Sequence, residues 1–230
     1  MKEIAILMAA GLGSRMRPIT DTVPKPLVKV HGKAMIETVV EGLLLRGVEE
    51  IYVVTGYLQE QFEQWKHKYP QVHTIYNPDF SVKNNISSIY AAREILQKGN
   101  CFICESDLII KDQNIFRKKL KGSCYYGRMQ SGYSDDWVFE TRNDRITRIG
   151  KGGQDCYNMV GVAYFEVKEA QLLGKFIEEA YNSGFCDDWF WDDVVNAHLD
   201  KLKLYVEPVK EGQMLEIDTV EELERVNRES

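Results

Sequence analysis

Apolar runs typical of strands alternate with helical patterns through the first half of the chain. The expected strands are 2–8, 50–55, 72–76 and 101–105, and the expected helices are 34–45, 58–68 and 85–96. Such alternation requires crossover connections, which place the strands side by side and parallel. We therefore expect an α/β fold built on a doubly wound, mainly parallel, Rossmann-like sheet.

The pattern changes after about residue 122. Short strands are expected at 123–126, 137–141, 146–149 and 158–165, followed by helices at 168–182 and 189–199, a strand at 203–207 and a last helix at 219–227. Runs of strands with little helix between them are typical of antiparallel pairing. We therefore expect a small antiparallel subregion beside or over the carboxyl edge of the main sheet.

A glycine-rich turn with three basic side chains follows the first strand directly. This glycine segment, residues 8–26, reads MAAGLGSRMRPITDTVPKP. Its glycines allow backbone N–H groups to approach an anion closely, and Arg15, Arg17 and Lys25 supply positive charge. It is neither a P-loop, which needs Gly-Lys-Ser/Thr after the second glycine, nor a dinucleotide turn, which needs a third glycine. The segment predicts a polyphosphate site of another kind.

The composition limits the possible partners. The 230 residues carry a formal net charge of −6 with 44% hydrophobic residues, and no basic run interrupts the mixed charges. Nucleic acid and anionic membranes are therefore not expected as partners, and an anionic ligand must meet a local group of cations. No leader-like segment or run of 18 apolar residues occurs, so we expect a cytoplasmic protein without membrane insertion.

The five cysteines form no spaced disulfide framework. Cys101 and Cys104 form a C-x-x-C motif within an apolar run that is typical of a strand. Residues three apart on a strand face opposite sides, so a metal bound by both is not expected. We interpret these cysteines as buried structural thiols.

Polar residues follow the later strands, where ligands bind in open α/β sheets. Gly56 and Tyr57, after the second strand, would permit close approach of a base or ribose, or else form a tight turn into the next helix. Segment 83–88 reads KNNISS and offers amides and hydroxyls that can read a base edge. Helix capping alone would explain one of its two asparagines.

Two acidic segments lie where they could serve one site. Glu105-Ser106-Asp107 ends the fourth strand, and Glu216-Ile217-Asp218 precedes the last helix. Mg²⁺ prefers carboxylate and phosphate oxygens, and strand alternation would put Glu216 and Asp218 on one face. The alternative for Asp218 is an N-cap of the last helix.

Aromatic residues stand beside acids in two segments of the second half, YSDDW at 133–137 and DDWFWDD at 187–193. Aromatic faces bordered by carboxylates bind a quaternary ammonium, which cannot donate a hydrogen bond. Three consecutive aromatics on a helix cannot all face one way, so at least one of Trp189, Phe190 and Trp191 is expected in the core. Packing of all of them is the alternative.

The glycine segment resembles the signature of the sugar-phosphate nucleotidyltransferases, a Leu-x-Ala-Gly-x-Gly-x-Arg run followed by Pro-Lys-x-Leu. It reads LMAAGLGSRMRPIT at 7–20 and PKPL at 24–27. The chain length and the NN-x-x-S, E-S-D, W-D and E-I-D segments are similar to the small bacterial CTP:phosphocholine cytidylyltransferases. The chain also resembles the related enzymes that load 2-aminoethylphosphonate onto CTP.

The resemblance implies in-line attack of an acceptor phosphate oxygen on the α-phosphorus of CTP, with release of pyrophosphate and formation of CDP-choline. Arg15 would hold the β- and γ-phosphates, and Lys25 would bridge the α-phosphate and the acceptor. Bound Mg²⁺ would be held by Asp107, Asp218 and Glu216. Relatives more often have Asp-x-Asp where Glu105 begins the first segment, so its role stays open.

The other implied site residues fall into two groups. Nucleotide binding is assigned to Ala9, Ala10, Gly11, Gly13, Ser14, Gly56, Tyr57, Asn84, Asn85 and Ser88. Acceptor binding is assigned to Tyr133, Asp136, Trp137, Phe190, Trp191 and Asp192. The chain is then one nucleotidyltransferase domain, 1–230, with a nucleotide-binding core at 1–121, an acceptor-binding portion at 122–217 and a C-terminal helix at 218–230.

The expected partners are CTP and a small zwitterionic phospho- or phosphono-acceptor, with phosphocholine favoured. The primary ammonium of 2-aminoethylphosphonate would favour carboxylates such as Asp136 or Asp192 over a full aromatic cage. A sugar-1-phosphate nucleotidyltransferase usually has a longer chain and a sugar-binding pattern not found here. A non-catalytic nucleotide sensor would lose the acids or Lys25, which this chain keeps. The oligomeric state stays open.

Overall fold

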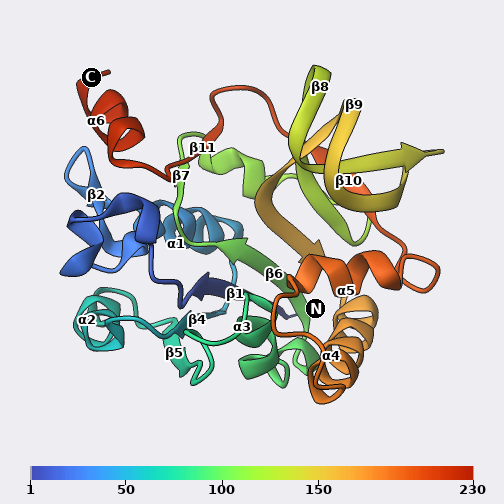
Figure 1. Ribbon diagram of the computed structural model, residues 1–230, viewed down its shortest axis with the longest axis horizontal. Coiled ribbons are helices and arrows are strands. Elements are labelled where there is room, and N and C mark those ends of the chain that lie inside the picture. Colours follow the sequence, from blue (N-terminus) through green and yellow to red (C-terminus); the bar gives the residue numbers. More distant parts are fainter. Residues whose placement is uncertain (1, 230) are drawn as a thin grey trace.

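A seven-stranded sheet forms the centre of the computed structural model, which describes residues 2–229 (Figure 1). The strand order is β10-β8-β9-β6-β1-β4-β5. The parallel strands are β1 (Glu3–Ala9), β4 (Glu50–Thr55), β5 (Val72–Tyr76) and β6 (Asn100–Glu105). The strands beyond β6 are β8 (Cys124–Arg142), β9 (Arg145–Phe165) and β10 (Tyr205–Pro208). The expected α/β, mainly parallel fold is confirmed.

Helices cover both faces of this sheet. The helices are α1 (Met35–Arg46), α2 (Gln59–Trp65), α3 (Ile86–Ala91), α4 (Val167–Asn182), α5 (Trp191–Ala197) and α6 (Val220–Arg228). Along β1, Ala5 and Leu7 pack with α1 and α2, whereas Ile4 and Ile6 pack with α3, α4 and α5. Both faces of β1 are therefore buried, which explains its continuous apolar run.

The expected short strands of the second half merge into one long antiparallel ribbon. β8 and β9 join at Asn143 and Asp144, which both have positive φ, as a tight hairpin turn requires. Residues 138 and 139 of β8 pair with β9 at 149–150 and again at 157–158, so the ribbon curls back on itself. β9 then pairs antiparallel with β6 and joins the ribbon to the main sheet.

Three helices are shorter than their sequence patterns predict. α2 ends at Trp65 rather than at residue 68, because a 3-10 turn follows at Lys66–Lys68. α3 ends at Ala91 rather than continuing to residue 96, because a separate 3-10 turn at Ile95–Gln97 leads the chain into β6. α5 begins at Trp191 rather than 189, because Phe190 has the extended conformation of an N-cap and its N–H donates to Asp193 Oδ2. Trp189 and Phe190 therefore precede the helix.

A small sheet that the sequence analysis missed brings the two acidic segments together. β7 (Leu108–Ile110) pairs antiparallel with β11 (Met214–Glu216), and Glu216 lies opposite Leu108. Helix α6 then packs Leu223 and Val226 against Met16 of the glycine segment. The C-terminal end of the chain thus holds the glycine segment in place. A second short pair, β2 (Lys29–Val30) and β3 (Lys33–Ala34), lies beside α6 (Figure 1).

The cysteine side chains are all buried and free. Cys101 packs in the core on one face of the sheet and Cys104 in the core on the other. The interpretation as structural thiols on opposite faces of a strand is confirmed. Within residues 2–229, no helix is both long and apolar enough to span a bilayer.

Candidate active site

The glycine segment turns sharply at the carboxyl end of β1. Gly13 has φ of 63°, in the left-handed region, and a Cβ there would lie 2.9 Å from the Cβ of Lys25. Glycine is therefore needed both for the turn and for the close packing of Lys25. Gly11 differs, because a Cβ placed on it would meet no atom within 4 Å. The backbone at Gly11 faces open space, where a ligand can approach it.

Lys25 is held between two carboxylates from distant parts of the chain. Its Nζ lies 2.5 Å from Asp107 Oδ2 and 2.6 Å from Asp218 Oδ1. Burial by itself would lower the pKa of Lys25, but the two carboxylates outweigh it and raise that pKa above its usual value. Arg15 also reaches Asp218, with Nη2 2.7 Å from Oδ1. Both cations are thereby fixed at the mouth of the glycine turn.

Asp218 therefore belongs with the basic side chains. Its pKa is lowered below the usual value, because Lys25 and Arg15 outweigh the opposing effect of burial. The N-cap of α6 is Thr219, whose hydroxyl accepts from the N–H of Glu222. The alternative interpretation of Asp218 as a helix cap is wrong.

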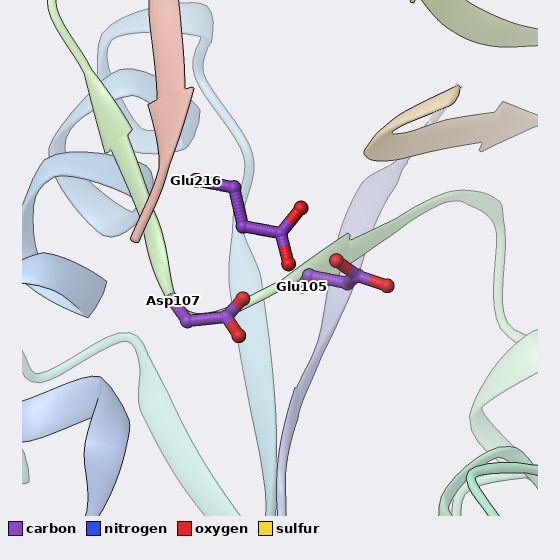
Figure 2. A group of neighbouring side chains, drawn as sticks. All are labelled: Glu105, Asp107 and Glu216. Atoms are coloured by element: carbon purple, nitrogen blue, oxygen red, sulfur yellow. The ribbon is translucent and has the colours of Figure 1, made fainter. Parts of the chain in front are cut away.

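Three carboxylates form the acidic cluster of the site: Glu105, Asp107 and Glu216. One oxygen from each lies within 4.8 Å of the others, and Figure 2 shows the three side chains gathered in one place. The pKa of Glu216 rises to about 8, first because the surrounding protein removes water from its carboxylate and second because Asp107 places a negative charge nearby. Burial likewise raises the pKa of Glu105 well above its usual value. Such a group of anions is stabilised by a bound cation.

The donor set of the acidic cluster fits Mg²⁺, which takes oxygen ligands. The expected metal set was Asp107, Asp218 and Glu216. Asp107 and Glu216 do lie together, but the third member of the cluster is Glu105. Asp218 instead forms ion pairs with Arg15 and Lys25. Sequence alone left the role of Glu105 open, although its position two residues before Asp107 on the same strand end was a signal.

Three adjoining cavities form a cleft along the carboxyl ends of the strands. The glycine cavity, about 370 Å³, is lined by residues that include Gly11, Ser14, Lys25 and Asp218. The amide cavity, about 300 Å³, is lined by the polar residues of segment 83–88 and by Ala10, Asn77 and Phe80 among others. The aromatic cavity, about 330 Å³, is lined in part by Trp137, Phe190 and Asp192. Arg15 borders all three.

The amide cavity contains residues that sequence reasoning missed. Asn77, which follows β5 and is 1% exposed, donates from Nδ2 to Ser87 Oγ at 2.9 Å and to Ser88 Oγ at 3.3 Å. It therefore orients the start of α3. Phe80, which was also missed, lines this cavity, as does Lys83 of the expected segment 83–88. The signal for Asn77 was the rule applied to the other strands, a polar residue directly after a strand end.

Gly56 and Tyr57 lie outside the three cavities. A Cβ on Gly56 would come within 2.6 Å of Phe80 Cγ and 2.9 Å of the Ala10 carbonyl oxygen. The N–H of Tyr57 donates to that same carbonyl at 3.2 Å. The structure therefore supports the tight-turn interpretation of these two residues. Their expected direct contact with the nucleotide is not supported.

The aromatic cavity mixes carboxylates with an aromatic pair. Trp137 and Phe190 meet edge to face with ring centroids 5.2 Å apart. Asp135, Asp136 and Lys151 also line the cavity, and sequence reasoning had missed Asp135 and Lys151. The two acids stand next to each other, which was a usable signal.

Asp192 is a buried carboxylate at the wall of the aromatic cavity. It is 4% exposed and accepts a hydrogen bond from the Tyr125 hydroxyl at 3.0 Å. Burial raises its pKa from 3.8 to about 7, and the Tyr125 hydroxyl only partly opposes that rise. No cationic side chain among residues 2–229 pairs with it.

Two expected acceptor residues lie elsewhere. Trp191 is 3% exposed and stacks on Tyr125 in the core, with centroids 5.5 Å apart, because the first turn of α5 points it inward. Tyr133 is 70% exposed on the ribbon and lines none of the three cavities. Arg17, a basic residue of the glycine segment, likewise lines none of the three cavities and pairs with Asp21 at 3.2 Å.

Comparison with known proteins relates this geometry to enzymes. A family model described as nucleotidyl transferase matches residues 4–123. A 2-aminoethylphosphonate cytidylyltransferase of Lancefieldella rimae is 50% identical over 96% of this chain and 91% of its own length. A choline-phosphate cytidylyltransferase of Streptococcus pneumoniae is 32% identical over 96% of both chains. The solved structure of a CTP:phosphocholine cytidylyltransferase from that species matches with a TM-score of 0.90, 30% identity and 99% coverage of both chains.

Proposed function

The chain belongs to the nucleotidyl transferase family, among its small bacterial cytidylyltransferases, and from that premise we propose that it transfers the cytidylyl group of CTP to 2-aminoethylphosphonate. The observation that carries this choice of acceptor is the 50% identity, over nearly the whole chain, to an enzyme named for that acceptor. Phosphocholine, which the sequence motifs favoured, becomes the second candidate.

The side chains of the aromatic cavity support the same acceptor. A primary ammonium donates three hydrogen bonds, whereas a trimethylammonium donates none. Asp192 accepts from Tyr125 but has no cationic partner among the described residues, and Asp135 and Asp136 line the same cavity. With Trp191 in the core, the aromatic lining consists of Trp137 and Phe190. Carboxylates beside one aromatic pair suit a primary ammonium.

Phosphocholine is the second candidate because of a specific feature. Trp137 and Phe190 form a pair of rings against which a quaternary ammonium can rest. The Streptococcus pneumoniae relatives, named for choline phosphate, match over the whole chain. These observations favour measurable activity with phosphocholine, below that with the phosphonate.

The proposed reaction is an in-line displacement at the α-phosphorus of CTP. A phosphonate oxygen forms a new P–O bond there, and the bond to the bridging oxygen of pyrophosphate breaks. Lys25 stands between the glycine turn and the acidic cluster, where it can neutralise both the α-phosphate and the phosphonate. Arg15, which borders all three cavities, can hold the leaving phosphates. Positioning and charge neutralisation carry the rate acceleration, without a protein nucleophile.

Mg²⁺ is the proposed cofactor. Glu105, Asp107 and Glu216 would hold it, and when bound it would neutralise charge on the triphosphate. Lys25 is paired with Asp107, so it stands next to this position. The chain's own contribution is to keep Lys25 protonated and oriented beside the bound phosphates.

Parallel assays with purified protein test the proposal. CTP and Mg²⁺ are combined with 2-aminoethylphosphonate, phosphocholine or glucose-1-phosphate, and pyrophosphate release is measured. We expect kcat/KM to be highest for the phosphonate by at least about tenfold, a difference of about 1.4 kcal/mol in transition-state stabilisation. Chelation of Mg²⁺ should abolish release with every acceptor.

Each outcome of these assays has a defined meaning. Preference for phosphocholine would replace the proposed acceptor by the second candidate. Preference for glucose-1-phosphate would contradict the small zwitterionic acceptor altogether. Undiminished turnover in the chelator would contradict the role given to the acidic cluster.

A further inference from the structure

The start of α3 and the segment before α5 are joined by bonds that the proposed reaction does not require. The acceptor loop, residues 183–190, connects α4 to α5, and most of it is solvent-exposed. Phe185 at its tip is 85% exposed. Such a loop depends on a few contacts for its position.

Hydrogen bonds and an ion pair from three consecutive residues of the amide cavity supply several of those contacts, beside the buried side chain of Cys186 and the edge-to-face contact of Phe190 with Trp137. The N–H of Asn84 donates to the Asp187 carbonyl at 2.7 Å, and its Nδ2 donates to the Asp188 carbonyl at 3.1 Å. Asn85 Oδ1 accepts from the N–H of Trp191 at 3.0 Å. The ammonium of Lys83 pairs with the Asp187 carboxylate.

Both ends of the Asn84 amide take part in this arrangement. Its Oδ1 accepts from the N–H of Asn85 at 2.7 Å while its Nδ2 holds the acceptor loop. Asn84 therefore positions the acceptor loop, whatever further contact it makes with a base. Asn85 Nδ2, by contrast, makes no hydrogen bond within residues 2–229 and borders both the amide and the aromatic cavities.

The acceptor loop that these hydrogen bonds hold leads directly into the proposed acceptor site. The loop delivers Phe190 to the aromatic cavity, and the next turn delivers Asp192. Trp191, between them, donates its N–H to Asn85 Oδ1 and is fixed by stacking on Tyr125. A displacement of Asn84 or Asn85 thus moves the walls of the acceptor site.

We propose that Lys83, Asn84 and Asn85 form a latch through which an occupied nucleotide site holds the acceptor loop in its binding position. This rests on the proposed nucleotide site. A nucleotide that packs against residues 83–85 restricts them to the conformation in which the latch is closed. The acceptor then binds to walls that are already ordered, so the two ligands bind cooperatively. By linkage, each ligand raises the affinity for the other by the same factor.

Amide hydrogen exchange of the acceptor loop, measured without any acceptor, tests the latch. Peptides that cover residues 184–191 are followed in the wild-type protein, with and without saturating CTP and Mg²⁺. We expect nucleotide to slow their exchange by about fivefold or more, the lower end of typical coupling between sites. Unchanged or faster exchange at proven nucleotide saturation would overturn the proposal.

Two variants and a matched control locate the effect. Asn84→Asp keeps the size of the side chain but removes the donor to the Asp188 carbonyl, and it should lose most of the nucleotide-dependent slowing. Asp187→Asn breaks the pair with Lys83 from outside the amide cavity and should lose part of it. Asp188→Asn makes the same change of charge one residue away, on a side chain without a hydrogen bond or ion pair within residues 2–229, and should keep the slowing. Equal slowing in all three variants would contradict the latch.

The readout separates this proposal from the proposed function. Nucleotide-dependent protection without turnover of 2-aminoethylphosphonate would leave the latch standing and sink the proposed acceptor. Turnover of 2-aminoethylphosphonate without slower amide exchange of the acceptor loop would support the proposed acceptor and overturn the latch. Failure of CTP to bind would overturn both.

Discussion

The two ends of the cleft hold their charges in opposite ways. At the phosphate end of the cleft, which is the glycine cavity, Lys25 is 9% exposed and contacts Asp107 and Asp218 within 2.6 Å. These charges are therefore paired with one another before any ligand binds. At the acceptor end, Asp192 is 4% exposed and has only hydrogen bonds, with no cationic side chain among the described residues. One end is preorganised around its own ion pairs, and at the other end the proposed acceptor's ammonium would be the cation that pairs with the carboxylate.

Under the proposed function, this difference would let the cleft bind a polyanion and a zwitterion side by side. A buried charge without a partner lowers stability, and its pKa shifts toward the neutral form. At the phosphate end the pKa of Lys25 is raised, which keeps it charged before substrate arrives. At the acceptor end the pKa of Asp192 is raised to about 7, so the unliganded site is partly neutral. A ligand cation would reverse that shift.

The largest expected effect comes from breaking the phosphate end. Lys25→Ala removes the cation that Asp107 and Asp218 share, and we expect kcat to fall by about 10³-fold, since the loss of one preorganised donor to a developing negative charge costs an enzyme about 10²–10³-fold in kcat. Steady-state pyrophosphate release measures it, with circular dichroism as the check on folding. Arg17→Ala, which removes a basic side chain of the same segment outside the cleft, is the control. Near-normal kcat in folded Lys25→Ala protein would refute the assigned role.

A smaller effect is expected at the acceptor end. Asp192→Asn keeps the acceptor for the Tyr125 hydroxyl but removes the charge, so KM for 2-aminoethylphosphonate should rise about ten- to a hundredfold while KM for CTP changes little. Hydrogen bonds to charged groups contribute about 1.5–3 kcal/mol, which sets this range. Steady-state kinetics with each substrate varied in turn measure it. An unchanged acceptor KM would show that the ammonium lies elsewhere.

Asp192→Asn should also change how the stability of the protein depends on pH. The folded-state pKa of Asp192 lies at about 7 against an ordinary value of 3.8, so the folded state keeps a proton that the unfolded state has lost between these pH values. Its contribution to stability is present below pH 4 and is lost as the pH rises to 7. Asp192→Asn should therefore gain Tm relative to the wild type as the pH rises from 4 to 8. Asp200→Asn, an exposed carboxylate on the turn after α5, should follow the wild type across this range.

The smallest effect is expected from the aromatic pair. Trp137→Ala removes one ring of the aromatic cavity, and an exposed cation–π contact contributes about 0.5–1 kcal/mol, or roughly two- to fivefold in KM. We expect that change for 2-aminoethylphosphonate and a larger one for phosphocholine, whose ammonium depends on ring faces. The ratio of the two acceptor KM values is the measurement. A larger loss for the phosphonate would make the ring pair, rather than the carboxylates, the main recognition element.

Much of the fold and of the phosphate end could be predicted from the sequence. The alternation of β1, α1, β4, α2 and β5 follows from apolar periodicity, which is a property of neighbouring residues. One continuous segment contains Gly11, Gly13, Arg15 and Lys25, so their motif can be recognised in the sequence. The predictions for the second half were weaker, because separate short strands merged into the β8–β9 ribbon.

The acidic cluster and the acceptor end needed the tertiary structure. Glu216 reaches Glu105 only because β11 pairs with β7, which the sequence pattern did not reveal. Trp191 turns into the core because α5 begins two residues later than its pattern predicts. Asn84 looked free to read a base, yet its amide is bound to a loop more than a hundred residues away.

The sequence by itself determined the family, the doubly wound core and the cation-bearing glycine segment. Backbone conformation and local charge depend mainly on residues that are neighbours in the sequence. Only the tertiary structure decided which acids face one another and which ion pairs form. Lys25 meets Asp107 and Asp218 across separations of 82 and 193 residues. Side-chain contacts over such distances depend on how whole elements pack, and no local pattern specifies them.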